Sequence, residues 1–141
     1  MSDPFVDTDV LVRLLTGDDP EKQAQAAAMF QQVEAGNITV QAPDTVIADA
    51  VYVLSSPRLY NVPRHEVRDM LSALTRLPHF SVDNRRSVLR ALELYGATSL
   101  DFGDAFIVAS MERAGSATLY SYDRDFDSIS GVERRPPGSA R

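Results

Sequence analysis

The sequence predicts one α/β domain, in which short strands alternate with helices around a mostly parallel sheet. Short β-branched and aromatic runs of strand type recur along the chain, and most are followed by apolar residues at helical spacing. With 141 residues, of which 44% are hydrophobic, the chain is long enough to bury one core without disulfides. We expect a single domain over residues 1–133 and a frayed tail over residues 134–141.

The expected strands are short and lie between helix signals. The first strand, residues 5–6, ends at Asp7 and is followed directly by a helix that runs to Leu15. Further strands are expected at residues 38–40, 80–82 and 117–120, with a last edge strand around Val132. Two consecutive helices between the second and third strands are the one departure from strict alternation. Strands and helices arranged in this way form a parallel sheet covered on both faces.

Local capping residues mark the helix ends. Asp19 is expected to cap a helix that has Pro20 at its first position and ends at Gly36. Further helices are expected to begin at Asp44, at Pro63, at Asp83 or Asn84, and at Asp101, the last of them ending at Gly115.

The composition excludes several kinds of site. The chain has no cysteine, which excludes disulfides and thiolate metal sites, and two histidines are too few for a histidine-rich zinc site. Any metal ion would therefore be bound by oxygen ligands, which favours magnesium or manganese. No leader-like or membrane-spanning stretch is visible, so we expect a cytoplasmic protein that does not enter membranes.

The net charge of −6 argues against a general nucleic-acid binder. Two features weaken that argument. All basic residues except Lys22 are arginines, which are suited to bidentate contacts with phosphate. An acidic site would also supply part of the negative charge, and bound cations would neutralise it locally.

Acidic residues follow several of the expected strands. Asp7 ends the first strand, and ligands in open α/β sheets lie beyond the carboxyl ends of the strands. Carboxylates that converge there repel one another, and a divalent cation would remove that cost and activate a water molecule for phosphodiester hydrolysis. The other candidates are Asp49, Asp101, Asp104 and Asp123, whereas Asp125 and Asp127 are expected to be turn and surface residues.

Four segments carry a resemblance to one family. Residues 5–11 (FVDTDVL) resemble the opening of a PIN-domain ribonuclease, in particular of the VapC-type toxins of bacterial toxin–antitoxin pairs. Residues 46–54 (VIADAVYVL), 100–105 (LDFGDA) and 120–126 (YSYDRDF) resemble the later acidic segments of that family. The resemblance covers nearly the whole chain. It implies a PIN-like, three-layer α/β/α fold with a central, mostly parallel sheet of four or five short strands.

The resemblance also implies the site residues. Four acids hold Mg²⁺ or Mn²⁺ in that family, and the matching positions here are Asp7, Asp49, Asp104 and Asp123. Thr8, Asp101 and Ser121 are expected to support these ligands. From the residues alone, Asp101 is more typical of an N-cap with Asp104 at N3, and Asp123 could be a turn residue. Asp7 could cap its helix, a role that Thr8 or Asp9 could fill equally well.

Three positions depart from the family pattern. Asp49 replaces the usual glutamate and is one methylene shorter, Ser121 replaces threonine, and Asp9 stands where asparagine is common. The shorter Asp49 side chain would lie about 1.5 Å further from a metal ion, one carbon–carbon bond length.

The resemblance implies an endoribonuclease that acts as the toxin of a toxin–antitoxin pair. It implies a structured RNA substrate such as tRNA or rRNA, a cognate antitoxin that covers the site, and a homodimer. Two alternatives remain open. The Asp7-Thr8-Asp9 spacing is also that of haloacid-dehalogenase-like phosphatases, and a PIN-like module that binds proteins without cutting RNA would keep the fold.

Overall fold

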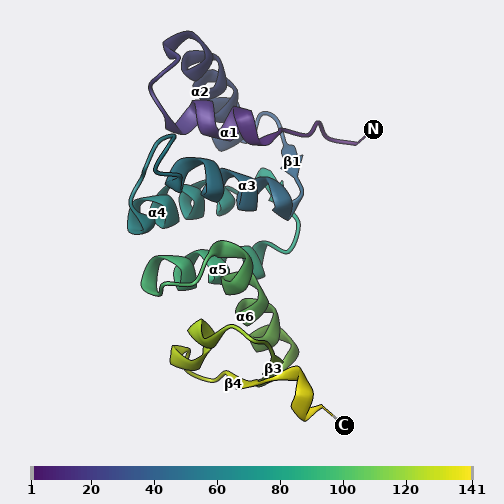
Figure 1. Ribbon diagram of the computed structural model, residues 1–141. Helices are drawn as coiled ribbons and strands as arrows, with labels where there is room; N and C mark the ends of the chain where they lie inside the picture. The colour runs from purple at the N-terminus through teal and green to yellow at the C-terminus, as the bar shows by residue number, and fades with distance from the viewer. Residues whose placement is uncertain (1, 141) are drawn as a thin grey trace.

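The computed structural model describes residues 2–140. Its α-helices are α1 (Thr8–Leu15), α2 (Pro20–Glu34), α3 (Asp44–Ser55), α4 (Arg64–Thr75), α5 (Arg85–Ala97) and α6 (Phe102–Ala114). The strands are β1 (Val40–Ala42), β2 (Phe80–Val82), β3 (Thr118–Tyr120) and β4 (Glu133–Arg135), and the 3₁₀ helices are η1 (Arg124–Ser128) and η2 (Pro137–Ser139). The helices follow one another down the molecule in chain order, with α1 and α2 at one end and β3 and β4 at the other (Figure 1).

The capping residues that the sequence marks hold the helix ends. Asp19 caps α2 by accepting a hydrogen bond from the Lys22 backbone N–H at 3.1 Å. Gly115 ends α6 in the left-handed region, at φ 72°, where a side chain would be strained. Both predictions are confirmed. They could be made from the sequence because each depends on residues within one helical turn.

Every strand pair is parallel, as predicted. β1 pairs with β2 so that Val40 lies opposite Phe80, and β3 pairs with β4 so that Thr118 lies opposite Glu133. The first expected strand is reduced to a single bridge between Phe5 and Gln41. The α/β class with short parallel strands is confirmed.

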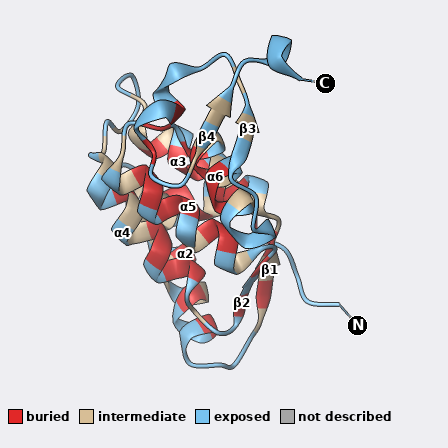
Figure 2. Cartoon of the chain, turned by 90° about the horizontal axis from the view of Figure 1, so that it is seen from below, coloured by how far each residue is buried: buried red, intermediate tan, exposed pale blue. Residues whose placement is uncertain are grey.

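The expected single sheet of four or five strands is divided. Among residues 2–140, β1–β2 and β3–β4 are two separate two-stranded sheets, and they lie at different places along the helical body (Figure 2). Each strand has three residues, so few backbone hydrogen bonds join it to a neighbour. Residues 5–6 bond to β1 on one side. On their other side they have no partner strand in the described part of the chain.

The chain remains ordered beyond the expected end of the domain. The sequence predicted a frayed tail from residue 134, but β4 continues to Arg135. Arg134 is held on both sides, because its guanidinium donates to the Asp127 carboxylate at 2.7 Å and to the Ser121 carbonyl at 3.0 Å. These contacts hold the first two residues of the predicted tail in place, and the domain boundary at residue 133 stays a prediction.

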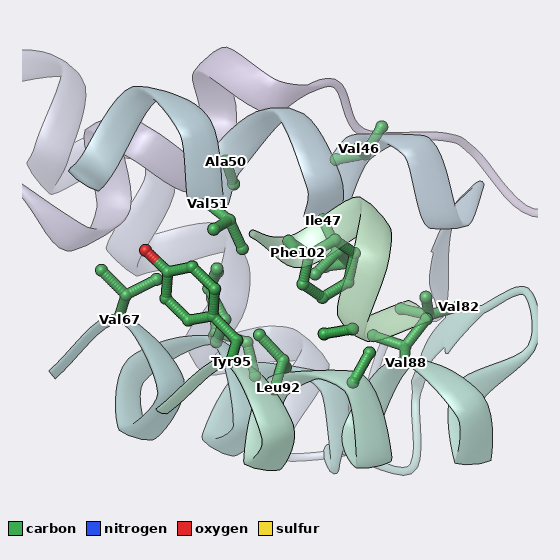
Figure 3. Close-up of a cluster of buried hydrophobic side chains, with 14 of the residues drawn as sticks. Val46, Ile47, Ala50, Val51, Val67, Val82, Val88, Leu92, Tyr95 and Phe102 are labelled. Atoms are coloured by element: carbon green, nitrogen blue, oxygen red, sulfur yellow. The ribbon is translucent and has the colours of Figure 1, made fainter. Parts of the chain in front are cut away.

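The core lies where α3, α5 and the start of α6 meet. Ile47 from α3 and Leu92 from α5 are fully buried there, beside Phe102 from α6 (Figure 3). Near β2, the Phe30 and Phe80 rings make an edge-on contact at 5.5 Å between centroids. This packing holds the first turn of α6, with its acidic residues, at the surface next to α3. None of the helices in residues 2–140 is both long and apolar enough to cross a bilayer.

Candidate active site

Two acidic residues define the start of α6. Asp101 is its N-cap, and the Asp101 carboxylate accepts a hydrogen bond from the Asp104 backbone N–H at 2.8 Å. The capping role predicted for Asp101 is confirmed. The Asp104 carboxylate is half-buried and receives no hydrogen bond from residues 2–140, so the reciprocal half of a capping box is absent there. Asp104 is therefore left available for a ligand.

The turn after β3 supplies a second pair of acidic residues. The Ser121 hydroxyl accepts from the Asp123 backbone N–H at 3.0 Å, and the Asp123 carboxylate accepts from the Asp125 backbone N–H at 2.8 Å. Ser121 therefore ends its strand and shapes the turn that presents Asp123. Asp123 is exposed and uses one carboxylate oxygen in this turn, which leaves the other oxygen free.

These two pairs form one electrostatic group, which we call the α6 acidic group (Asp101, Asp104, Asp123 and Asp125). The pKa of Asp104 is raised, first by partial burial and then by repulsion from the other three carboxylates. No arginine, lysine or histidine of residues 2–140 forms an ion pair with any of the four. Asp125 belongs to the group although the sequence suggested only a turn role. Its proximity to Asp104 depends on packing and leaves no sequence signal.

Asp7 lies in a different part of the molecule. It is the N-cap of α1, where its carboxylate accepts from the Val10 backbone N–H at 3.1 Å, and it is exposed. The chain before it pairs with β1 through the Phe5 bridge, whereas Asp123 follows β3 in the other sheet. Because the two sheets share no hydrogen bonds, these two strand ends do not lie along one sheet edge. Thr8, the first residue of α1, accompanies Asp7.

Asp49 lies on the exposed face of α3, between the buried Ile47 and Ala50. Its position on this helix was predicted correctly. Its membership of a shared site is not apparent from its contacts, since it forms no ion pair or hydrogen bond through its carboxylate within residues 2–140.

The donor chemistry suits a hard divalent cation, but the arrangement is incomplete as a metal site. Within residues 2–140, no three histidine, aspartate or glutamate side chains are close enough together to hold a metal ion. The structure associates Asp104 with Asp123 and does not bring Asp7 and Asp49 to them. The oxygen ligands are those that magnesium and manganese prefer, whereas the number of gathered ligands is too small.

Arg64 supports this region, although no sequence pattern marked it. Its guanidinium donates to the Tyr95 carbonyl at 2.9 Å and to the Leu100 carbonyl. It therefore fixes the loop that leads into Asp101 and the first turn of α6. The signal lies in tertiary contacts between α4 and the end of α5, which periodicity cannot show.

Comparison with known proteins identifies the family. The model of the PIN domain matches residues 5–132, so the chain belongs to the PIN-domain family. This is a family of nucleases that generally use a divalent metal ion. One similar solved structure is the crystal structure of Mycobacterium tuberculosis VapC20, described as a sarcin–ricin loop cleaving toxin. It is 20% identical with a TM-score of 0.39, and the match covers 94% of this chain and 98% of that one. No curated protein matches the sequence.

Proposed function

We propose that this PIN-domain protein is a metal-dependent endoribonuclease of the VapC type, the toxin of a toxin–antitoxin pair. The observation that carries the proposal is the α6 acidic group. In a chain of this family, partial burial and three neighbouring carboxylates raise the pKa of Asp104, and none of the four acids forms an ion pair within residues 2–140. Unpaired, partly buried carboxylates destabilise a fold, and a perturbed group of this kind is typical of a functional site.

The proposed cation is Mg²⁺ or Mn²⁺. Bound at these carboxylates, such an ion would offset their mutual repulsion, contact the substrate phosphate and supply an activated water molecule. Asp104 and Asp123 are the proposed central ligands. Asp101 and Ser121 hold them in place through the backbone hydrogen bonds at the start of α6 and after β3.

Asp7 and Asp49 are the proposed remaining ligands, with Thr8 supporting Asp7. Their membership rests on the resemblance of residues 5–11 and 46–54 to the acidic segments of the family. Mutation tests it directly, since a residue that only caps α1 or faces solvent on α3 would not affect cleavage.

The proposed substrate is a structured RNA such as tRNA or rRNA. The proposed partners are a second copy of the chain and a cognate antitoxin. The exposed acidic residues around Asp104 fit neutralisation by a basic antitoxin segment, because opposite charge favours both encounter and specificity.

One alternative has an observation in its favour. The four family positions are not gathered into one metal site in the described residues, which is what a PIN domain that binds proteins without cutting RNA would allow. The two functions differ in one outcome, because the non-cutting protein would leave RNA intact at every concentration of magnesium or manganese.

The decisive experiment maps cleavage ends in total RNA after brief expression. We expect 5′-phosphate ends from the wild-type protein and none from Asp104→Asn, Asp123→Asn, Asp7→Asn or Asp49→Asn, with the fold checked by circular dichroism. Asp69→Asn is the matched control, because Asp69 is an exposed acid that pairs with Arg68 on α4. Cleavage that persists in the four variants would refute the site, and no cleavage by the wild-type protein would refute the activity.

A further inference from the structure

We propose that a groove beside the α6 acidic group binds one unpaired nucleobase of the RNA substrate. The groove has a volume of about 330 Å³ and lies between α3, the end of α5 and the start of α6. This inference deepens the proposed function and rests on it. We call this groove the base subsite; it is lined by Ala48, Val51, Tyr52, Ser55, Arg64, Tyr95, Asp101, Phe102 and Gly103.

The base subsite is next to the proposed chemistry. Asp101, which caps α6, forms part of its lining, and Asp104 lies one turn further along the helix. On the other side, α3 contributes Tyr52, which lies three residues after Asp49. A nucleotide in this groove would therefore be a close neighbour of a phosphate held at the α6 acidic group.

The floor of the base subsite contains a polar group without a partner. Tyr95 is 3% exposed, and its ring extends from α5 toward Val51 on α3 (Figure 3). Within residues 2–140, no group forms a hydrogen bond with the Tyr95 hydroxyl. The hydroxyl is not one of the fully buried polar atoms that lack a partner, so its oxygen is accessible from the groove and can form a hydrogen bond with a ligand there.

Arg64 provides a fixed planar surface in the same groove. Its guanidinium carbon lies 3.9 Å from the centroid of the Tyr95 ring, and its hydrogen bonds to two backbone carbonyls hold it there. It forms no ion pair with a carboxylate of residues 2–140. Guanidinium planes are surfaces on which RNA bases stack.

Tyr52 is the second stacking surface. Its side chain is 73% exposed, although tyrosines on a helix next to a core usually bury their rings. An exposed aromatic ring at the rim of a groove fits the flat face of a base, and such stacking tolerates any base. The Ser55 hydroxyl nearby makes only a long hydrogen bond, at 3.4 Å, to the Tyr52 carbonyl and can contact a base edge.

The combination of groups favours a nucleobase over other ligands. A base presents two flat faces and a hydrogen-bonding edge, which match an aromatic ring, a guanidinium plane and hydroxyl groups. The volume lies at the lower end of the range of small-ligand pockets, as expected for a subsite that holds one ring system.

The test compares two RNA probes that differ only in their bases. Wild-type protein in EDTA, which prevents cleavage, is titrated with a fluorescent short oligoadenylate and with an abasic RNA of equal length. We expect the oligoadenylate to bind about tenfold more tightly, the effect of one stacked base. Tyr52→Ala should remove this preference by weakening only the oligoadenylate, whereas Tyr52→Phe should keep it. Leu59→Ala is the matched control, because Leu59 is 59% exposed in the turn after α3 and does not line the groove.

Tyr95→Phe tests the floor separately. It should leave the stacking preference intact and reduce discrimination among oligoadenylate, oligouridylate and oligocytidylate by a few fold, because it removes one hydroxyl. Equal affinity of Tyr52→Ala and wild-type protein for the oligoadenylate, or an equal loss for the abasic RNA, would overturn the base subsite. So would a Tyr52→Ala variant that loses only self-association or antitoxin binding.

These outcomes are distinct from failure of the proposed function. If the wild-type protein cuts RNA while Tyr52→Ala shows normal binding and cleavage, the base subsite fails and the nuclease stands. If the wild-type protein distinguishes the two probes through Tyr52 but never cuts RNA, the base subsite stands and the nuclease fails.

Discussion

The two ends of α6 carry opposite electrostatic arrangements. At its start, the α6 acidic group brings Asp104 near three other carboxylates with no ion-pair partner among residues 2–140, and the pKa of Asp104 is raised. Near its end, Glu112 forms two hydrogen bonds with Arg90, at 2.7 and 3.1 Å, and the pKa of Glu112 is lowered. Arg90 also pairs with Glu93.

The difference sets a stabilising contact against the proposed functional site. The Arg90–Glu112 contact joins α5 to α6 with the two-pronged geometry that makes such pairs strong. At the other end the Asp101 carboxylate caps the helix, but the repulsion around Asp104 has no counter-charge and a cation would offset it. Under the proposed function, one helix therefore carries both a contact that reinforces the fold and a group of carboxylates whose repulsion a ligand would offset.

The largest expected effect comes from Asp104→Asn. We expect RNA cleavage to fall by on the order of 100-fold or more, since a ligand is lost. The free energy of unfolding without metal should be unchanged or slightly higher, because a repelled carboxylate is removed. Cleavage assays and urea denaturation check the two parts. If Asp104→Asn unfolds more easily than the wild-type protein and cuts RNA normally, Asp104 stabilises the fold and is not a ligand.

Removal of the cation gives the next largest effect. With Mn²⁺ or Mg²⁺ about tenfold above its Kd, the free energy of unfolding of the wild-type protein should rise by about 1.4 kcal/mol. The Tm should then rise by about 3–6 °C and return to its starting value in EDTA. Thermal denaturation measures this shift. Asp104→Asn should show little of it, and an equal shift in both proteins would place the cation elsewhere.

Glu112→Gln tests the reinforced end. Since both partners are more than a third exposed, solvent screening limits the expected loss to about 0.5–1 kcal/mol of unfolding free energy. RNA cleavage should not change, because Glu112 lies at the far end of α6 from Asp104. Urea denaturation and the cleavage assay measure the two quantities side by side. Impaired cleavage with normal stability would show that Glu112 contributes to catalysis rather than to the fold.

The smallest effect is a dependence on pH. Glu112 has a lowered pKa in the folded protein because of Arg90, so its stabilisation is fully present above its ordinary value of 4.5. It is lost as the pH falls through the lowered folded-state pKa. The difference in unfolding free energy between wild-type protein and Glu112→Gln should therefore shrink below about pH 4.5. Denaturation at a series of pH values measures it, and a difference that grows in acid would contradict the pairing.

The parts of the fold that depend on nearby residues were predictable. The caps Asp19 and Asp101 and the stop at Gly115 act within one helical turn, and the structure places them as expected. Strand pairing was harder to predict. Pairing depends on which distant edges meet, and a three-residue strand carries too little pattern to specify its neighbour. For that reason the division into two sheets and the continuation of β4 to Arg135 had no local sign.

The candidate site shows the same limit. The sequence indicated that Asp104 and Asp123 belong together, and the raised pKa of Asp104 agrees with their proximity. The contribution of Asp125 and the support from Arg64 arise from tertiary packing and could not be read from spacing. Asp7 and Asp49 are not among the charges that raise the pKa of Asp104, and their membership of the site stays a prediction. The sequence did not reveal that the strand end before Asp7 and β3 belong to different sheets.

The pairing of β1 with β2 has a consequence for the order of folding. Val40 faces Phe80, so the whole of α3 and α4 lies between the two strands in the chain. Closing so long a loop costs entropy, and three paired residues form too few hydrogen bonds to offset much of that cost. During synthesis β1 can bond to residues 5–6 on one edge, whereas its other edge must wait until both helices and β2 have left the ribosome.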